Sequence, residues 1–214
     1  HFAVRDIREN YVYIATPHFT HHEMLKRVLS EGKHVISEKP LGLNMDEVRE
    51  AYGLADKNGL YIGAGLLLNH HPFYIRIKEL QKELGPITSM HVENNATESR
   101  IPSGWYWDKE KSGGWFVISE LQWYHLFAWL TAAEDARVNV AAEIKADGRT
   151  RKTKSGVETI EGKQVLEVNH RMDCKDEEIS CTISITFESG EAVLEGWIPS
   201  SITAVSYTHL RAHE

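Results

Sequence analysis

Between residues 11 and 84, short apolar segments alternate with helix-like segments, and this alternation limits the possible folds more than any other feature of the sequence. The runs at 11–15, 34–37 and 60–64 have the composition of buried strands. Apolar residues at helical spacing follow each of them, at 24–29, 48–55 and 72–84. Strands that alternate with helices form right-handed βαβ units on a parallel sheet. We therefore predict half of a doubly wound α/β domain.

Turn and cap residues stand at the expected boundaries of these segments. Pro17 stops the first strand, and Gly32 stands where the first helix should end. Asn44, with Glu47 three residues later, resembles a capping box that starts the second helix, and Gly59 closes it. Local signals thus agree with the periodicity.

After residue 85 the pattern changes to strand-like alternation with one strongly apolar helix, at about 115–130. The expected strands are 87–97, 136–146, 165–172, 178–187 and 191–198. We predict the C-terminal half of a Rossmann-type parallel sheet at 1–85, followed at 86–204 by an α+β domain with a mainly antiparallel sheet.

The two ends of the chain have unusual sequences. The chain begins at His1, and no complete element precedes the strand at 11–15, so we expect further sequence upstream. Residues 205–214 read VSYTHLRAHE, which resembles a translated sequencing adapter, and we set them apart as an artefactual tail. An ordinary polar tail is the alternative.

Charge and cysteine content narrow the possible partners and location. Lys and Arg number 24 against 31 Asp and Glu, a net charge of -7, which argues against nucleic acid as a partner. No leader peptide or long apolar span is visible, so we expect no membrane contact. Cys174 and Cys181 fit free, buried thiols in the cytoplasm, although a disulfide in an exported protein is the alternative.

Histidines raise the question of a metal site. The pairs His21-His22 and His70-His71 are adjacent in sequence, and adjacent residues on a helix point about 100° apart. Such pairs seldom chelate one ion, and no ligand spacing with carboxylates or thiols stands out. We therefore expect no metal.

Polar residues gather where the first two strands end. Ligands of open parallel sheets bind at the carboxyl ends of the strands. A lysine held there beside a cationic ligand ring has its ammonium form disfavoured, so it can accept a proton near neutral pH. A solvated lysine at a strand end is the simpler interpretation. The two groups are Thr16-Pro17-His18 with His21, and Glu38-Lys39-Pro40.

Several motifs occur together in a recognisable order. YIATPHFTHHE is followed by GKHVISEKPL, then by GLYIGAG with HPFYIRIKEL, Trp107-Asp108, Ser112-Gly113-Gly114 and a hairpin at 179–197. The ordered set resembles the Gfo/Idh/MocA family of oxidoreductases over nearly all of the chain before Val205. Each motif alone is weak to moderate, but their order is specific.

The resemblance implies a Rossmann domain that binds NAD or NADP, and a C-terminal sheet often used for homo-oligomer contacts. It places Thr16, Pro17, His18, His21, Glu38, Lys39 and Pro40 near the nicotinamide. The glycine-rich turn, and the residue that selects NAD or NADP, are expected upstream of His1. The fragment by itself is therefore expected to bind cofactor weakly and to be inactive.

The acid-base helix of the family departs from its usual pattern here. In the family an aspartate is followed four residues later by a histidine, and three further on by another aspartate. Gap-free alignment from Ser112-Gly113-Gly114 puts Ile118, Gln122 and His125 at these positions. Their spacing favours one helix face. A register shift of about three residues, which moves His125 to the histidine position, matches the flanking sequence less well.

Lys39, Gln122 and His125 are thus the candidate catalytic residues. Gln122 can orient a substrate hydroxyl but cannot titrate, whereas His125 can exchange a proton near pH 7. A histidine packed inside an apolar helix is the alternative for His125. The expected reaction is hydride transfer between NAD(P) and a hydroxyl of a sugar, cyclitol or related polyol. An NAD-dependent glycosidase and a cofactor-binding protein without standard catalysis remain open.

Overall fold

The computed structural model describes residues 4–8, 10–98, 104–133, 136–146, 149–159 and 165–207. The chain forms two compact units. The first comprises His1–Leu66 and Pro102–Leu121, and the second comprises Leu67–Ile101 and Gln122–Glu214. Each unit has its own buried apolar core.

A four-stranded sheet forms the centre of the first unit, in the order β1-β2-β3-β4. Strands β2, β3 and β4 are parallel, which confirms the expected Rossmann-type arrangement. Strand β1 runs antiparallel to β2, so the expectation that no complete element precedes Tyr11 was wrong. The bounds are β1 Val4–Arg8, β2 Tyr11–Ile14, β3 His34–Ser37 and β4 Ile62–Ala64.

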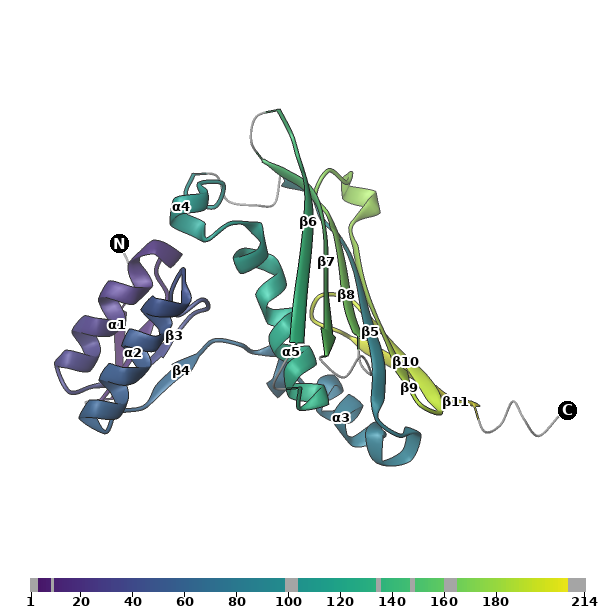
Figure 1. Ribbon diagram of the computed structural model, residues 1–214, viewed down its shortest axis with the longest axis horizontal. Coiled ribbons are helices and arrows are strands. Elements are labelled where there is room, and N and C mark those ends of the chain that lie inside the picture. Colours follow the sequence, from purple (N-terminus) through teal and green to yellow (C-terminus); the bar gives the residue numbers. More distant parts are fainter. Residues whose placement is uncertain are drawn as a thin grey trace, which may run out of the picture. The chain divides into compact units, whose positions relative to one another are not determined.

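Two helices cover this sheet, α1 at His21–Ser30 and α2 at Met45–Asn58 (Figure 1). Leu25 and Leu29 of α1 are fully buried in the same apolar cluster as Ala51 of α2. The predicted cap of α2 is present, because the Asn44 side chain accepts a hydrogen bond from the Glu47 amide at 3.0 Å. The unit also contains the short helices η1, His18–Thr20, and α4, Lys109–Ser112.

The second unit contains a seven-stranded sheet in the order β11-β10-β9-β5-β8-β7-β6. All neighbouring strands are antiparallel except the β5–β8 pair, which confirms the predicted α+β architecture. The bounds are β5 Ile87–Asn95, β6 Ala136–Ile144, β7 Thr150–Thr159, β8 Val165–Arg171, β9 Ser180–Phe187, β10 Gly190–Glu195 and β11 Ser201–Ser206.

Strands β7 and β11 were not predicted. In β7 the buried alternate positions are Thr153, Ser155, Val157 and Thr159, so small polar side chains face inward and the apolar alternation is weak. Strand β11 reaches into the segment set apart as a tail, because Val205 pairs with Glu191 and Ser206 with Gly190. Residues 208–214 of that segment lie outside the described residues.

Helices α3, Pro72–Leu84, and α5, Leu121–Thr131, pack on one face of this sheet (Figure 1). Tyr74 and Ile77 of α3 are fully buried with Trp123 of α5. The sequence pattern grouped α3 with the first domain, yet its apolar side belongs to the second core. No described helix is long and apolar enough to cross a lipid bilayer.

Candidate functional site

The parallel strands of the first unit end at a common edge. The Glu38 amide donates to the Ile14 carbonyl at 2.8 Å, and the Gly65 amide donates to the Ser37 carbonyl at 2.7 Å. A Cβ atom on Gly65 would lie only 3.1 Å from Glu38 Oε2, so glycine permits this close approach. The edge brings together the strand-end cluster, which we define as Thr16, Pro17, His18, His21, Glu38, Lys39 and Pro40.

His21 joins the two halves of the strand-end cluster. Its side chain is fully buried, with Nδ1 2.6 Å from the Pro40 carbonyl and Nε2 2.7 Å from the Thr16 carbonyl. A carbonyl oxygen can only accept a hydrogen bond. A His21 ring nitrogen that bonds to one of these carbonyls must therefore carry a hydrogen and donate it. His21 therefore holds the segment after β2 against the segment after β3.

His18 lies beside it on η1, which starts after Pro17, and only 7% of its surface is exposed. Nδ1 donates to the Ser112 carbonyl at 2.8 Å, which fixes the neutral tautomer and leaves a lone pair on Nε2. Burial lowers the pKa of His18 from 6.5 to about 4, and the Ser112 bond only partly opposes this. The ring packs edge-on against Trp105, with centroids 4.8 Å apart.

Glu38 and Thr16 are tied to the surrounding secondary structure. The Tyr13 hydroxyl donates to Glu38 Oε1, and this bond raises the pKa of Tyr13 to about 12. The Thr16 hydroxyl shares a 2.6 Å hydrogen bond with that of Thr20. Both residues are thus held in place from the strands and the start of α1.

Lys39 follows Glu38 and is half-buried. Its Nζ donates to the backbone carbonyl of Ile118, and burial lowers the lysine pKa. Ile118 lies in a π-helical segment, Phe116–Glu120, that the sequence did not predict. In a π segment the backbone hydrogen bonds join residues five apart instead of four, and such segments are frequent at functional sites. Ile118 therefore contacts Lys39 through its backbone carbonyl and not through its side chain.

The other two candidate catalytic residues belong to the second unit. Gln122 and His125 are half-buried on α5, and their spacing of three places them on one helix face. Burial lowers the pKa of His125, and a smaller electrostatic contribution from His70 acts in the same direction. His70 lies on η2, Leu68–His70.

The buried oxygen Asn69 Oδ1 precedes His70 and has no hydrogen-bond partner among the described residues. An unsatisfied acceptor of this kind is suited to a ligand hydroxyl.

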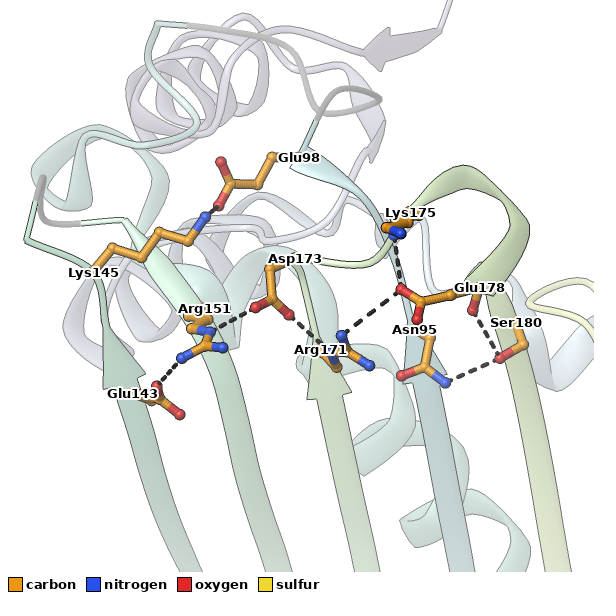
Figure 2. A network of polar contacts seen from close by, with 10 residues as sticks. All are labelled: Asn95, Glu98, Glu143, Lys145, Arg151, Arg171, Asp173, Lys175, Glu178 and Ser180. Atoms are coloured by element: carbon orange, nitrogen blue, oxygen red, sulfur yellow. Dashed lines mark hydrogen bonds and ion pairs between the residues drawn. The ribbon is translucent and has the colours of Figure 1, made fainter.

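A second polar group, the sheet-end network, lies at one end of the seven-stranded sheet (Figure 2). Asp173 accepts from Arg151 at 2.6 Å and from Arg171 at 2.9 Å, and these bonds lower its pKa to about 2. Arg151 also contacts Glu143 at 2.7 Å, and Lys145 pairs with Glu98. The network is a set of paired charges, with both arginine side chains 43% exposed.

No three His, Cys, Asp or Glu side chains converge as a metal site within the described parts of the chain. Cys174 and Cys181 are both free and buried, as expected. Burial raises the pKa of Cys181 to about 12.

Sequence reasoning located the strand-end cluster but missed its partners. Two of them, the carbonyls of Ser112 and Ile118, are backbone groups that every residue type carries. Tyr13 was assigned only to a strand. None of the three has a side-chain signature that points to Glu38, His18 or Lys39.

Comparison with known proteins confirms the family resemblance. Residues 4–66, which include the whole strand-end cluster, match the Gfo/Idh/MocA family, described as an oxidoreductase family with an NAD-binding Rossmann fold. An uncharacterized oxidoreductase of Streptococcus pneumoniae is 33% identical over 106 residues, covering 48% of this chain and 29% of that protein. Trans-1,2-dihydrobenzene-1,2-diol dehydrogenase of Mus musculus is 29% identical over 111 residues, covering 51% and 33%.

Solved structures share the fold. Levoglucosan dehydrogenase, in complex with NADH and levoglucosan, superposes with a TM-score of 0.80 at 19% identity, covering 93% of this chain and 57% of that one. This chain thus spans about a third of the length of the curated relatives it matches.

Proposed function

We propose that this chain, whose first unit carries the Gfo/Idh/MocA match, is part of an NAD(P)-dependent oxidoreductase acting on a hydroxyl of a sugar, cyclitol or related polyol. The observation that carries the proposal is Lys39, which is half-buried at the carboxyl edge of a parallel sheet and has a lowered pKa. Levoglucosan dehydrogenase, whose fold is similar, acts on a carbohydrate and was crystallised with NADH.

The strand-end cluster suits the nicotinamide end of the cofactor. Burial lowers the pKa of both His18 and Lys39 and so favours their neutral forms. Neutral side chains do not repel the positively charged nicotinamide ring of the oxidised cofactor. Thr16 and Glu38 add hydrogen-bonding groups at the same edge. When bound, the cofactor supplies a hydride acceptor.

In the proposed reaction the alcohol loses a hydride from carbon and a proton from oxygen. Lys39 as a neutral amine takes up that proton, directly or through a relay. The Ile118 carbonyl can only accept a hydrogen bond, so it orients Nζ and has no proton to give. Lys39 thus acts as an acid-base group, and the Ile118 carbonyl positions it.

Residues of the second unit are proposed to bind the substrate hydroxyls. Gln122 orients a hydroxyl, and Asn69 Oδ1 offers an unsatisfied acceptor. His125 exchanges a proton, because burial and His70 both favour its neutral, basic form. In the gap-free alignment, His125 would stand where the family has an aspartate and Gln122 where it has a histidine.

The decisive experiment measures reduction of NAD and NADP over a panel of sugars and cyclitols. It uses the chain itself and a chimera in which residues 1–204 replace the matching part of a full-length relative. Turnover should occur in the chimera, because the relative supplies the glycine-rich turn that holds the cofactor phosphates. Cofactor binding without turnover on any alcohol would instead identify a binding protein without standard catalysis.

His125→Asn tests the role of this histidine in the same chimera. The variant should lose about a hundredfold in kcat, and with it the rise in rate as the pH climbs through the pKa of His125, which lies below 6.5. His22→Asn, a change on the first unit, serves as control. An unchanged pH profile in His125→Asn would show that this histidine only packs in the helix and does not exchange a proton in the reaction.

We further propose that the chain forms a homo-oligomer through the second-unit sheet. Across β5, β7 and β8, the sheet face away from the helices is lined by charged side chains, among them Glu93, Lys154 and Glu167. The free thiols Cys174 and Cys181 fit a reducing compartment such as the cytoplasm.

A further inference from the structure

Strand β6 stands at the end of the seven-stranded sheet and pairs only with β7 among the described residues. Its side chains from residue 137 to 144 are exposed on both faces. Val138, Val140 and Ile144 are 52%, 51% and 54% exposed. A nine-residue edge strand with three exposed aliphatic side chains is a template for pairing with another strand.

The apolar residues of β6 share one side of the sheet. Val138 pairs with Val157 and Val140 with Ser155, and both partners on β7 are buried on the face that carries the helices. The alternate residues, including Arg137 and Glu143, therefore lie on the opposite face. One side of the open edge is apolar and the other is charged.

The charged residues of β6 are placed symmetrically. Arg137 and Glu143 are each three residues from Val140, on opposite sides of it along the strand. In two antiparallel copies of β6 related by a two-fold axis through Val140, each Arg137 faces Glu143 of the other copy. Glu143 already accepts from Arg151 at 2.7 Å, and its carboxylate has room for another donor.

Other registers lack this complementarity. Residues that face each other across an antiparallel pair point to the same face of the sheet. In a symmetric pair of β6 strands this holds only when one residue faces its own copy, so the two-fold axis must lie at a residue. An axis through Asn139 places Arg137 opposite Ala141. An axis through Ala141 places Arg137 opposite Lys145, which brings like charges together. Of these three registers, the one with its two-fold axis at Val140 is therefore the one in which opposite charges face each other.

We propose that the β6 edge binds the β6 edge of a second copy of this chain, antiparallel and centred on Val140, which joins two seven-stranded sheets into one. This inference rests on the proposed homo-oligomer and names the surface that forms it. Specificity comes from the two Arg137–Glu143 pairs and the facing valines. The backbone groups of the two edges supply the hydrogen bonds.

Cysteine cross-linking of the full chain tests the register. In the proposed pair the two Val140 residues are directly opposite, about 4.5–5.5 Å apart between Cα atoms, which is within disulfide range. The two Val138 residues are about 14 Å apart along the strands, which is too far. Val140→Cys should form a covalent dimer on mild oxidation at least about tenfold faster than Val138→Cys.

Val138→Cys is a matched control because the two valines are equally exposed on the same strand and face. The native Cys174 and Cys181 are buried, so they should not contribute. Equal cross-linking of the two variants, or none in either, would overturn the proposal. A dimer that forms in solution without selective cross-linking at Val140 would refute the β6 pairing and leave self-association through the sheet face.

Charge reversal provides the second test, measured by sedimentation equilibrium. Arg137→Glu and Glu143→Arg each create two like-charge pairs in a homodimer and should weaken it by about tenfold or more. When the two variants are mixed, every facing pair is again of opposite sign, and a heterodimer of wild-type affinity should form. Failure of mixing to restore affinity would contradict the proposed register. Neither substitution alters a residue assigned to the reaction.

Discussion

The strand-end cluster of the first unit and the sheet-end network of the second are both polar groups at the ends of strands, but they differ in burial. His18 and His21 are 7% and 0% exposed, and their ring nitrogens contact backbone carbonyls. In the network, Arg151 and Arg171 are 43% exposed and contact carboxylates.

Burial therefore gives the two groups opposite electrostatic character. In the strand-end cluster, desolvation is the main cause of the lowered pKa of His18 and of Lys39, so both shift toward neutral forms near pH 7. In the network, hydrogen bonds from two guanidinium groups keep Asp173 ionised. The first arrangement suits proton transfer, and the second suits a stable surface.

The largest expected effect comes from Lys39→Met in the active chimera. Loss of the amine should lower kcat by about 10²–10⁴-fold while cofactor affinity is largely retained, because the methionine keeps the bulk of the side chain. Steady-state kinetics and cofactor titration measure the two quantities. Lys57→Met, at an exposed site on α2, is the control. Unchanged turnover in Lys39→Met would show that this lysine does not take up the proton from the substrate hydroxyl.

His21→Leu should be the most destabilising change in the strand-end cluster. It leaves the Thr16 and Pro40 carbonyls without their buried donor and should lower the free energy of unfolding by about 3–5 kcal/mol. Urea denaturation measures the effect, with His22→Leu on the surface of α1 as control. Similar stabilities of the two variants would show that burial does not strengthen these bonds.

His18 should make stability depend on pH. Its folded pKa of about 4 lies below the usual 6.5, so the unfolded chain binds the proton more tightly. The stability it contributes is complete above pH 6.5 and is lost as the pH falls toward 4, by about 3 kcal/mol in total. His18→Gln should flatten this part of a curve of unfolding free energy against pH. The same slope in wild type and variant would contradict the buried, neutral state.

Asp173→Asn should have the smallest effect. Its pKa of about 2 lies below the usual 3.8, so its contribution is present above about pH 4 and lost as the pH falls toward 2. Because the arginines are exposed, the substitution should cost less than about 1 kcal/mol at neutral pH. Thermal unfolding at low and high salt measures it. A loss as large as that of His21→Leu would mean that the network is less solvated than its exposure indicates.

The sequence by itself determined the alternation of strands and helices between residues 11 and 84 and the polar edge of the first sheet. The βαβ alternation marked strands and helices, and Asn44 and Gly59 marked the ends of one helix, because periodicity and capping are local properties that neighbouring residues carry. The residues of the strand-end cluster could be named because parallel strands always end at one edge. The family resemblance followed from the same segments.

Only the tertiary structure decided what surrounds these residues. Burial lowers the pKa of Lys39, and its partner is a backbone carbonyl in a π segment 79 positions away, which no spacing rule anticipates. Strand β7 also escaped prediction, because its inward residues include the polar Thr153 and Ser155, which are buried only in the folded sheet. Local sequence specifies propensity, whereas desolvation and long-range hydrogen bonds exist only once distant segments have packed together.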